Sequence, residues 1–103
     1  MFWVYMLRCR DGSYYVGHSD DLARRLSEHE AGAVPCYTRY RRPLMLEFTQ
    51  AFDSREEALV AERRIKGWSR AKKQAMARGD WVAVGRFARG KNRHTRGPFD
   101  SGP

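Results

Sequence analysis

The chain has 103 residues and a mass of 12.0 kDa, which allows one domain with a modest core and excludes two. Twenty Lys and Arg residues against twelve Asp and Glu residues give a formal net charge of +8, which suits a polyanionic partner such as nucleic acid. Two cysteines, Cys9 and Cys36, are too few for a disulfide scaffold or a zinc site, so we expect free thiols.

The N-terminal sequence has no charged segment followed by a long apolar run, and no stretch approaches the roughly 18 apolar residues of a membrane span. We therefore expect a cytoplasmic protein without a membrane partner. The sequence also has no internal repeat and no Gly-rich phosphate loop before a helix, and we expect no organic cofactor.

A β-hairpin is predicted at the start of the chain. Residues 2–8 (FWVYMLR) are aromatic and β-branched, which is typical of a buried strand. Residues 10–12 (RDG) form a favoured three-residue turn with Gly12 in the left-handed position, and residues 13–17 complete the second strand.

The length of this turn decides where two tyrosines point. A three-residue turn places Cys9 opposite Ser13 and Tyr5 opposite Gly17. Because side chains alternate along a strand, Tyr5 and Tyr15 then project from the same face. A two-residue turn would place them on opposite faces.

A helix is predicted over residues 21–31, capped by one of the polar side chains at 19–21 and ended by a glycine. Arg25 and His29 are four residues apart and therefore share one face of this helix. Glu28 is expected to point elsewhere as a solvated charge.

The segment 33–43 (AVPCYTRYRRP) is predicted to be a loop in which aromatic and basic residues alternate. Such residues can stack on bases and pair with phosphates, although an arginine-rich loop is often simply solvated. The residues concerned are Tyr37, Tyr40, Arg39, Arg41 and Arg42. Residues 44–49 (LMLEFT) read as a third strand.

A second helix is predicted over residues 55–66, because Ser54 and Glu57 form a capping box. Glu62 lies on its core-facing stripe, where a carboxylate is costly unless a cation or several donors satisfy it. Glu62 is therefore either a structural ion pair with Arg or Lys, or a metal ligand or catalytic acid.

A third, basic helix is predicted over residues 70–78, with Met76 as core filler. Residues 80–87 (DWVAVGRF) either add a short strand or pack Trp81 against the domain. From about residue 88 we expect a mobile basic tail. The expected organisation is thus a domain over residues 1–80 and an extension over residues 81–103.

Five separated motifs resemble those of the GIY-YIG nuclease family. The first motif keeps only its tyrosine, in Val4-Tyr5-Met6, and the second is Tyr15-Val16-Gly17, with valine at its middle position. Three downstream segments, 37–39 (YTR), 42–43 (RP) and 52–66 (FDSREEALVAERRIK), are similar to the small single-domain bacterial branch of that family. The likeness covers roughly residues 2–78.

The resemblance implies an α/β fold with a small, three-stranded, mainly antiparallel sheet flanked by helices, in the order β-β-α-β-α-α. It also implies an endonuclease that depends on one divalent cation, Mg²⁺ or Mn²⁺. Carried over by position, the implied catalytic residues are Tyr5, Tyr15, Arg25, His29 and Glu62, with Glu62 as the metal ligand. The implied substrate-binding residues are His18, Tyr37, Arg39, Arg41, Arg42 and Lys66. The late asparagine of many members has no equivalent in this sequence.

These residue types suit phosphodiester hydrolysis, which needs a positioned water and neutralisation of developing charge. Arginine offers a fork of donors to phosphate, and the base among Tyr5, Tyr15 and His29 is left open. We expect the five catalytic residues to share one concave surface, rimmed by the loop arginines.

The expected function is hydrolysis of DNA in repair or processing, with little sequence specificity; structure-based or single-strand selectivity remains open. The alternative is a nucleic-acid-binding module on the same fold that does not cut.

Overall fold

The structure is a computed structural model of the chain and describes residues 1–33 and 37–89, with side chains described as far as residue 86. Cys36 and nearly all of the expected basic tail lie outside the described residues. The elements, in chain order, are β1 (Phe2–Arg8), β2 (Tyr14–Ser19), α1 (Leu22–Ala31), β3 (Met45–Phe52), α2 (Arg55–Lys66), α3 (Arg70–Ala77) and α4 (Trp81–Arg89).

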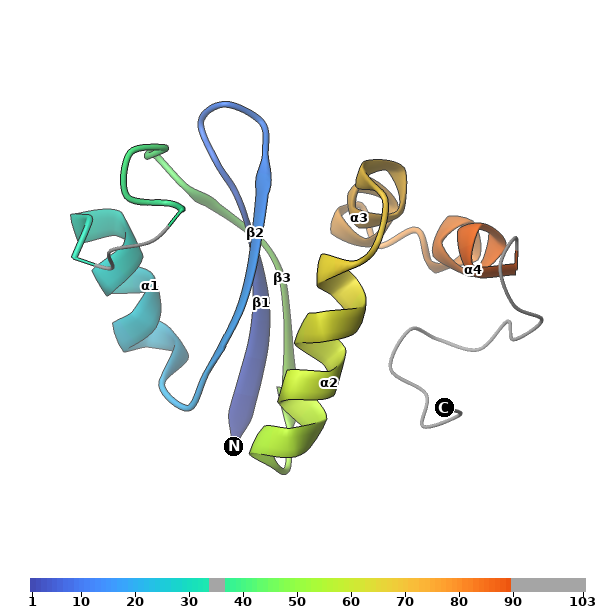
Figure 1. The fold of residues 1–103 in the computed structure, drawn as a ribbon, viewed down its shortest axis with the longest axis horizontal. Coiled ribbons are helices and arrows are strands. Elements are labelled where there is room, and N and C mark those ends of the chain that lie inside the picture. Colours follow the sequence, from blue (N-terminus) through green and yellow to red (C-terminus); the bar gives the residue numbers. More distant parts are fainter. Residues whose placement is uncertain (34–36, 90–103) are drawn as a thin grey trace.

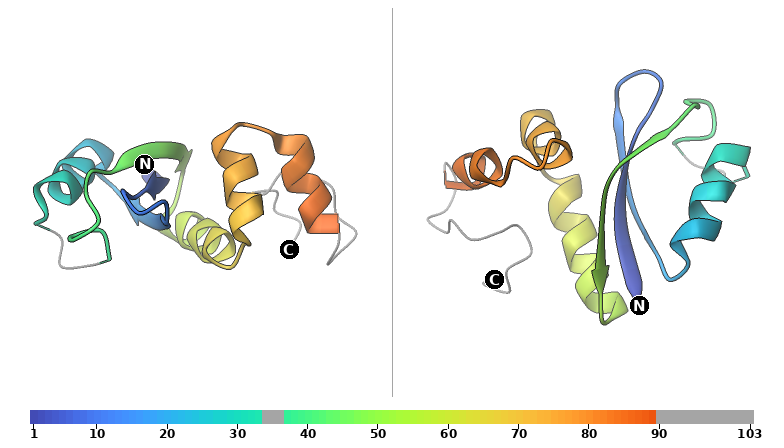
Figure 2. Two further views of the ribbon diagram at one scale, coloured as in Figure 1. Left: turned by 90° about the horizontal axis from the view of Figure 1, so that it is seen from above. Right: turned by 180° about the vertical axis from the view of Figure 1, so that it is seen from behind.

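The three strands form one antiparallel sheet in the order β2-β1-β3. Helix α1 covers one face of the sheet, and α2, α3 and α4 lie on the other side (Figures 1 and 2). The expected fold class and the order β-β-α-β-α-α are confirmed, with α4 as one further helix. None of these helices, within the described part of the chain, has the length and apolarity needed to span a bilayer.

The hairpin has the three-residue turn that the sequence predicts. The Cys9 amide donates to the Ser13 carbonyl at 2.8 Å, and Gly12 has a φ of 86°. Tyr5 lies opposite Gly17 in the register. Tyr5 and Tyr15 therefore project from the same face, as predicted.

The helix ends follow local sequence signals. Asp21 accepts a hydrogen bond from the Arg24 amide at 3.1 Å and caps α1, which ends at Gly32 with a φ of 70°. Ser54 caps α2 in the same way, accepting from the Glu57 amide at 3.2 Å. These bonds satisfy helix N–H groups that have no partner within the helix.

For the segment after α3, the structure decides between the two predicted alternatives, a short strand and packing of Trp81 against the domain. Residues 81–89 form a helix, not a strand, and Asp80 caps it by accepting from the Ala83 amide at 3.0 Å. Trp81 packs edge-on against Phe48, with ring centroids 6.0 Å apart, and Val84 is buried in the core. The predicted packing of Trp81 is thus correct. Strand β3 also runs to Phe52, three residues beyond the predicted end.

Alternation along the strands gives the two faces of the sheet different contents. Val4, Met6 and Val16 pack with the buried side chains of α2, α3 and α4 in the main core. Tyr5 and Tyr15 point to the opposite face, toward α1. The sheet thus divides an apolar core from a layer of polar aromatic groups.

Candidate active site

A chain of hydrogen bonds lies between β1 and α1. The Tyr5 hydroxyl is 2.8 Å from His29 Nε2, and Nδ1 of the same ring is 2.7 Å from Thr38 Oγ1. All three side chains are almost completely buried. Since buried polar groups are costly without partners, these contacts fix the orientation of the imidazole ring.

Arg25 lies at the more exposed end of this chain of hydrogen bonds. Its hydrogen bond to the Tyr5 phenol is the largest influence on the guanidinium and raises the pKa of Arg25, against the effect of burial. A guanidinium can only donate, so the phenol oxygen accepts from Arg25. With the ring proton on Nδ1, His29 donates to Thr38 Oγ1 and its Nε2 accepts from Tyr5; with the proton on Nε2, both directions reverse.

Arg25 also pairs with Glu28, Nη1 to Oε1, at 3.3 Å. The expectation that Glu28 points away as a solvated charge is therefore wrong. Residues three apart on a helix are neighbours, which explains the contact. The pair is half exposed and weak, so a phosphate can compete for the guanidinium.

His29 is held in its neutral form. Burial is the main cause that lowers the pKa of His29 from its ordinary value of 6.5, and the charge of Arg25 lowers it further, while Glu28 and Glu30 act in the opposite direction. A neutral imidazole whose Nε2 faces a phenol can take up the phenol proton. The Tyr15 ring lies 5.1 Å from the His29 ring, centroid to centroid, and belongs to the same group.

This lowered pKa of His29 predicts a pH dependence of stability. The unfolded chain takes up the histidine proton first as the pH falls, so the contribution is present above pH 6.5 and is lost as the pH falls through the folded-state pKa of His29. Urea unfolding of wild type and of His29→Gln at neutral and mildly acidic pH should show a smaller decrease in the variant. Equal decreases would contradict this assignment.

Gly17 brings Tyr5 close to the backbone of β2. A Cβ at Gly17 would lie 2.6 Å from the Tyr5 hydroxyl oxygen and 3.0 Å from Cε2 of Tyr15. The phenol of Tyr5 therefore lies directly over this residue, reaching from the central strand across to the edge strand. Only glycine leaves room for it.

A second polar group lies on α2. Glu62 Oε1 is 2.6 Å from His18 Nδ1, and Oε2 is 2.8 Å from Lys66 Nζ. Burial acts to raise the pKa of Glu62, but the hydrogen bonds from Lys66 and His18 outweigh it and hold that pKa below its usual value. The carboxylate is thus ionised, mostly buried and satisfied, as its place on the core-facing stripe requires.

The two polar groups approach the sheet from opposite faces. Tyr5, Tyr15, Arg25 and His29 lie together between the sheet and α1, whereas Glu62 lies on α2 at the other face, so the five residues do not share one side of the sheet. Both groups nevertheless lie at the same edge strand, β2. Gly17 beneath the Tyr5 phenol and His18 beside Glu62 are consecutive, about 3.3 Å apart along a strand.

The loop arginines mostly bond to the protein itself. Arg41 pairs with Asp11 at 3.2 Å, and its guanidinium carbon lies 3.8 Å from the centroid of the Tyr37 ring. Arg42 donates to the Glu30 carbonyl at 2.9 Å, near the end of α1. Arg39 is exposed, with its guanidinium carbon 5.5 Å from the Tyr40 ring centroid.

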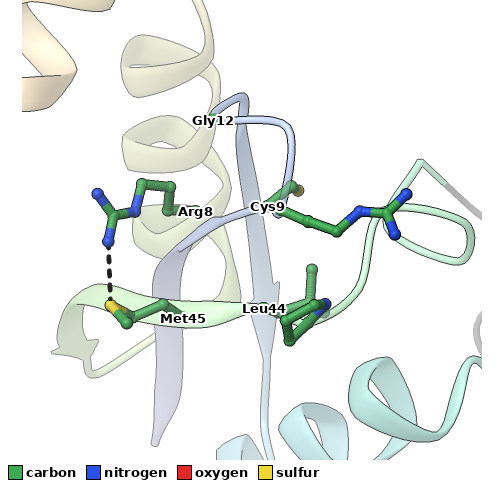
Figure 3. A pocket seen from close by; sticks show the side chains of 7 residues that line it. Arg8, Cys9, Gly12, Leu44 and Met45 are labelled. Carbon is green, nitrogen blue, oxygen red and sulfur yellow. Dashed lines mark hydrogen bonds between the residues drawn. The ribbon is translucent and has the colours of Figure 1, made fainter.

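Two cavities are lined by residues of the sheet and its neighbouring loops. One of about 200 Å³ is lined by residues that include Leu7, Leu26 and His29. The other, of about 370 Å³, lies at the hairpin turn, where Arg8 donates to the Met45 sulfur at 3.3 Å (Figure 3). The residues that line it are two arginines, the Cys9 thiol, a glycine and apolar groups, without a carboxylate or an imidazole.

Glu62 fits a divalent cation that keeps most of its waters. Within residues 1–33 and 37–89, no three His, Cys, Asp or Glu side chains are grouped as a ligand set. Magnesium is often held by one or two carboxylates together with water and substrate phosphate, which suits a lone ionised carboxylate. The Lys66 ammonium against Oε2 shows that this oxygen accepts a cation.

Most of the chain matches a known protein family. A family model described as the GIY-YIG catalytic domain matches residues 1–75, which is most of the chain. This protein belongs to the GIY-YIG family. Membership shows the nuclease-type domain, and with it the general expectation of nucleic-acid binding and a divalent metal.

Relatives in archaea and bacteria share the domain. A UPF0213 protein of Halobacterium salinarum is 49% identical over 76 residues, covering 74% of this chain and 99% of its own. One from Streptococcus pneumoniae is 46% identical over 72 residues, covering 70% of this chain and 73% of its own. Similar small proteins thus occur in both archaea and bacteria.

Two solution NMR structures have the same fold. That of a UPF0213 protein from Bacillus halodurans is 43% identical, covers 76% of this chain and 84% of its own, and has a TM-score of 0.50. That of a protein from E. faecalis is 38% identical, covers 75% and 82%, and has a TM-score of 0.53. The three-stranded sheet with flanking helices is thus shared across the family.

Thr38 is the residue of this GIY-YIG site that sequence reasoning missed as a functional group. It lies between two tyrosines in the loop before β3 and reads as an ordinary loop threonine. In the fold it is fully buried and holds His29 through Nδ1. Its position within the Tyr37-Thr38-Arg39 motif was the only available signal.

Proposed function

We propose that this protein is a metal-dependent endonuclease that hydrolyses phosphodiester bonds in DNA with little sequence specificity. The observation that carries the proposal is the buried hydrogen-bond chain from Tyr5 through His29 to Thr38 beside edge strand β2, with the Arg25 guanidinium at its outer end. It combines an anion-binding group with a neutral proton acceptor. The net charge of +8 supplies attraction to the phosphate backbone.

Arg25 binds a phosphate oxygen in this proposal. Guanidinium groups pair with phosphate through parallel hydrogen bonds, and the half-exposed contact to Glu28 yields to a doubly bonded phosphate. The bond from Arg25 to the Tyr5 phenol keeps the guanidinium close to the sheet while it does so. Arg25 therefore both orients the phosphate and neutralises charge that develops in the transition state.

Tyr5 and Tyr15 have different roles. Tyr5 is fully buried, so it does not meet bulk water; its hydroxyl, 2.8 Å from Nε2 of His29, orients the imidazole. Tyr15 is only partly buried and is the phenol that a substrate-bound water can reach. An ordinary phenol pKa near 10 keeps tyrosine protonated at neutral pH, so Tyr15 can orient the attacking water as a phenol but takes up its proton only after losing its own.

Glu62 would hold the divalent cation, Mg²⁺ or Mn²⁺, with His18 fixing the other carboxylate oxygen. When bound, the cation supplies neutralisation of phosphate charge and a lowered pKa for its bound water. The carboxylate reaches the edge of β2 from the α2 face, while Arg25 reaches it from the α1 face. A phosphodiester lying along this edge would contact both groups.

The loop of residues 37–42 is proposed to grip the nucleic acid, through Arg39 and Tyr40 in particular. Arg39→Ala should weaken binding and lower the slope of log affinity against log salt by about 1. Arg42→Ala should instead cost about 0.5–1.5 kcal/mol of stability, because it removes the bond to the Glu30 carbonyl. Fluorescence anisotropy across a salt series and urea unfolding separate the two effects. A loss of affinity in Arg42→Ala alone would reverse these assignments.

Labelled single-stranded, duplex and branched oligonucleotides incubated with Mg²⁺, Mn²⁺ or EDTA test the function. We expect products that require the metal, from at least one DNA form. Binding of all forms with no product under any condition would instead establish the second candidate, a module that binds without cutting. That candidate has one observation in its favour, since both oxygens of Glu62 are already occupied by His18 and Lys66.

A further inference from the structure

Lys66 occupies the oxygen of Glu62 that faces away from His18. Its ammonium is 2.8 Å from Oε2, whereas the imidazole of His18 holds Oε1 at 2.6 Å. The two partners of Glu62 differ in solvent exposure. The Lys66 side chain is 53% exposed, and that of His18 is 27% exposed, so the lysine is the partner that can leave.

Departure of Lys66 would leave the carboxylate in place. His18 Nδ1 still fixes Oε1, and the packing of α2 against the sheet keeps the residue buried. An ammonium on a flexible stem four residues away on a helix can swing into solvent at small cost. Glu62, only 11% exposed, would then present one ionised oxygen without a counter-charge.

We propose that Lys66 is a displaceable counter-ion that occupies the metal position on Glu62 and moves to a substrate phosphate when a divalent cation binds. The inference rests on the proposed function. In the free protein the ammonium satisfies a carboxylate that is costly to bury alone. When both ligands are present, the cation takes Oε2 and the ammonium pairs with phosphate.

This exchange couples the two ligands. A phosphate that attracts Lys66 frees Oε2, so it raises the affinity for the cation, and by linkage the cation raises the affinity for the phosphate by the same factor. A metal would therefore bind weakly to the free protein and more tightly beside nucleic acid. The site would be fully assembled only with substrate in place.

Binding of Mn²⁺ to the whole protein, followed by electron paramagnetic resonance, measures this directly. Lys66→Met should bind Mn²⁺ about three- to tenfold more tightly than wild type, because the competing cation is gone. Arg63→Met, on the same helix and exposed, removes an equal charge that does not contact Glu62 and should change the affinity by less than about twofold.

A short phosphorothioate oligonucleotide then serves as the second ligand. It should raise the Mn²⁺ affinity of wild type and raise that of Lys66→Met by a smaller factor. Equal Mn²⁺ affinities in wild type and Lys66→Met would overturn the proposal. If Lys66→Met then differs from wild type only by a lower melting temperature, the Lys66–Glu62 contact is a structural ion pair. Failure of Mn²⁺ to bind either protein would also overturn it.

These outcomes are separable from the proposed function. Metal-dependent cleavage by wild type with unchanged Mn²⁺ affinity in Lys66→Met would keep the nuclease and remove the counter-ion role. Tighter Mn²⁺ binding in Lys66→Met with no cleavage by wild type would keep the counter-ion role and remove the nuclease.

Discussion

Replacing Glu62 by glutamine should greatly lower the rate of metal-dependent cleavage while nucleic-acid binding remains. Glutamine keeps the size and an acceptor oxygen for His18, but it removes the ionised oxygen to which a hard cation binds. Loss of the metal's charge stabilisation, worth about 4 kcal/mol, corresponds to a rate roughly 10³-fold lower. Cleavage of labelled oligonucleotides with excess Mg²⁺ or Mn²⁺ gives the rate, and anisotropy in EDTA gives the binding.

Glu56→Gln is the matched control for this experiment. Glu56 lies on the same helix and is exposed, so its replacement makes the same chemical change without touching the site. Its cleavage rate should equal that of wild type. A Glu62→Gln variant that is folded and still cleaves at the wild-type rate would remove Glu62 from the chemistry.

Replacing Gly17 by alanine should damage both stability and activity. The added Cβ would be 2.6 Å from the Tyr5 hydroxyl oxygen, and Tyr5 cannot move away freely because it is fully buried and bonded to His29. Overpacking of this kind typically costs about 1–3 kcal/mol. We expect a loss of stability in that range by urea unfolding and a lower cleavage rate, since the phenol is displaced.

Gly67→Ala provides the control, because a Cβ at Gly67 would lie 3.6 Å from its nearest neighbour, an ordinary contact. A second background tests the cause. In Tyr5→Leu both close atoms of the Tyr5 ring, the hydroxyl oxygen at 2.6 Å and Cζ at 2.8 Å, are absent, so the cost of Gly17→Ala should fall, and the double-mutant cycle measures that coupling. If Gly17→Ala costs the same in both backgrounds, the close approach of Tyr5 is not what makes glycine necessary.

Much of the fold is specified by short segments. The Asp11-Gly12 turn sets the hairpin register, and that register alone places Tyr5 and Tyr15 on one face. The starts of α1 and α2 follow from Asp21 and Ser54, whose side chains bond to amides three residues away. Such signals are readable because both partners lie within a few residues of each other.

The helical form of α4 could not be predicted from its own residues, for the opposite reason. Its β-branched and aromatic residues favour a strand by propensity, but β1, β2 and β3 already form the sheet, and the segment is held by contacts distant in sequence. Trp81 packs on Phe48 of β3, and Val84 enters the core. Tertiary packing overrode a weak local preference.

The sequence by itself determined which residue types are available to the site and that Tyr5 and Tyr15 share a face, because strand alternation and turn length are local. It also placed Glu62 on a buried stripe, since helical spacing is local too. Which face of the sheet that stripe covers was decided only by the packing of α2 onto Val4 and Val16.

Three interactions were decided only by the tertiary structure. They are the hydrogen bond between Thr38 and His29, the bond from Arg42 to the Glu30 carbonyl near the end of α1, and the contacts of Glu62 with His18 and Lys66. The physical reason is desolvation. A buried imidazole or carboxylate is costly unless it has hydrogen-bond partners, and these come from residues distant in sequence. Sequence spacing does not reveal which donors and acceptors the fold places beside it.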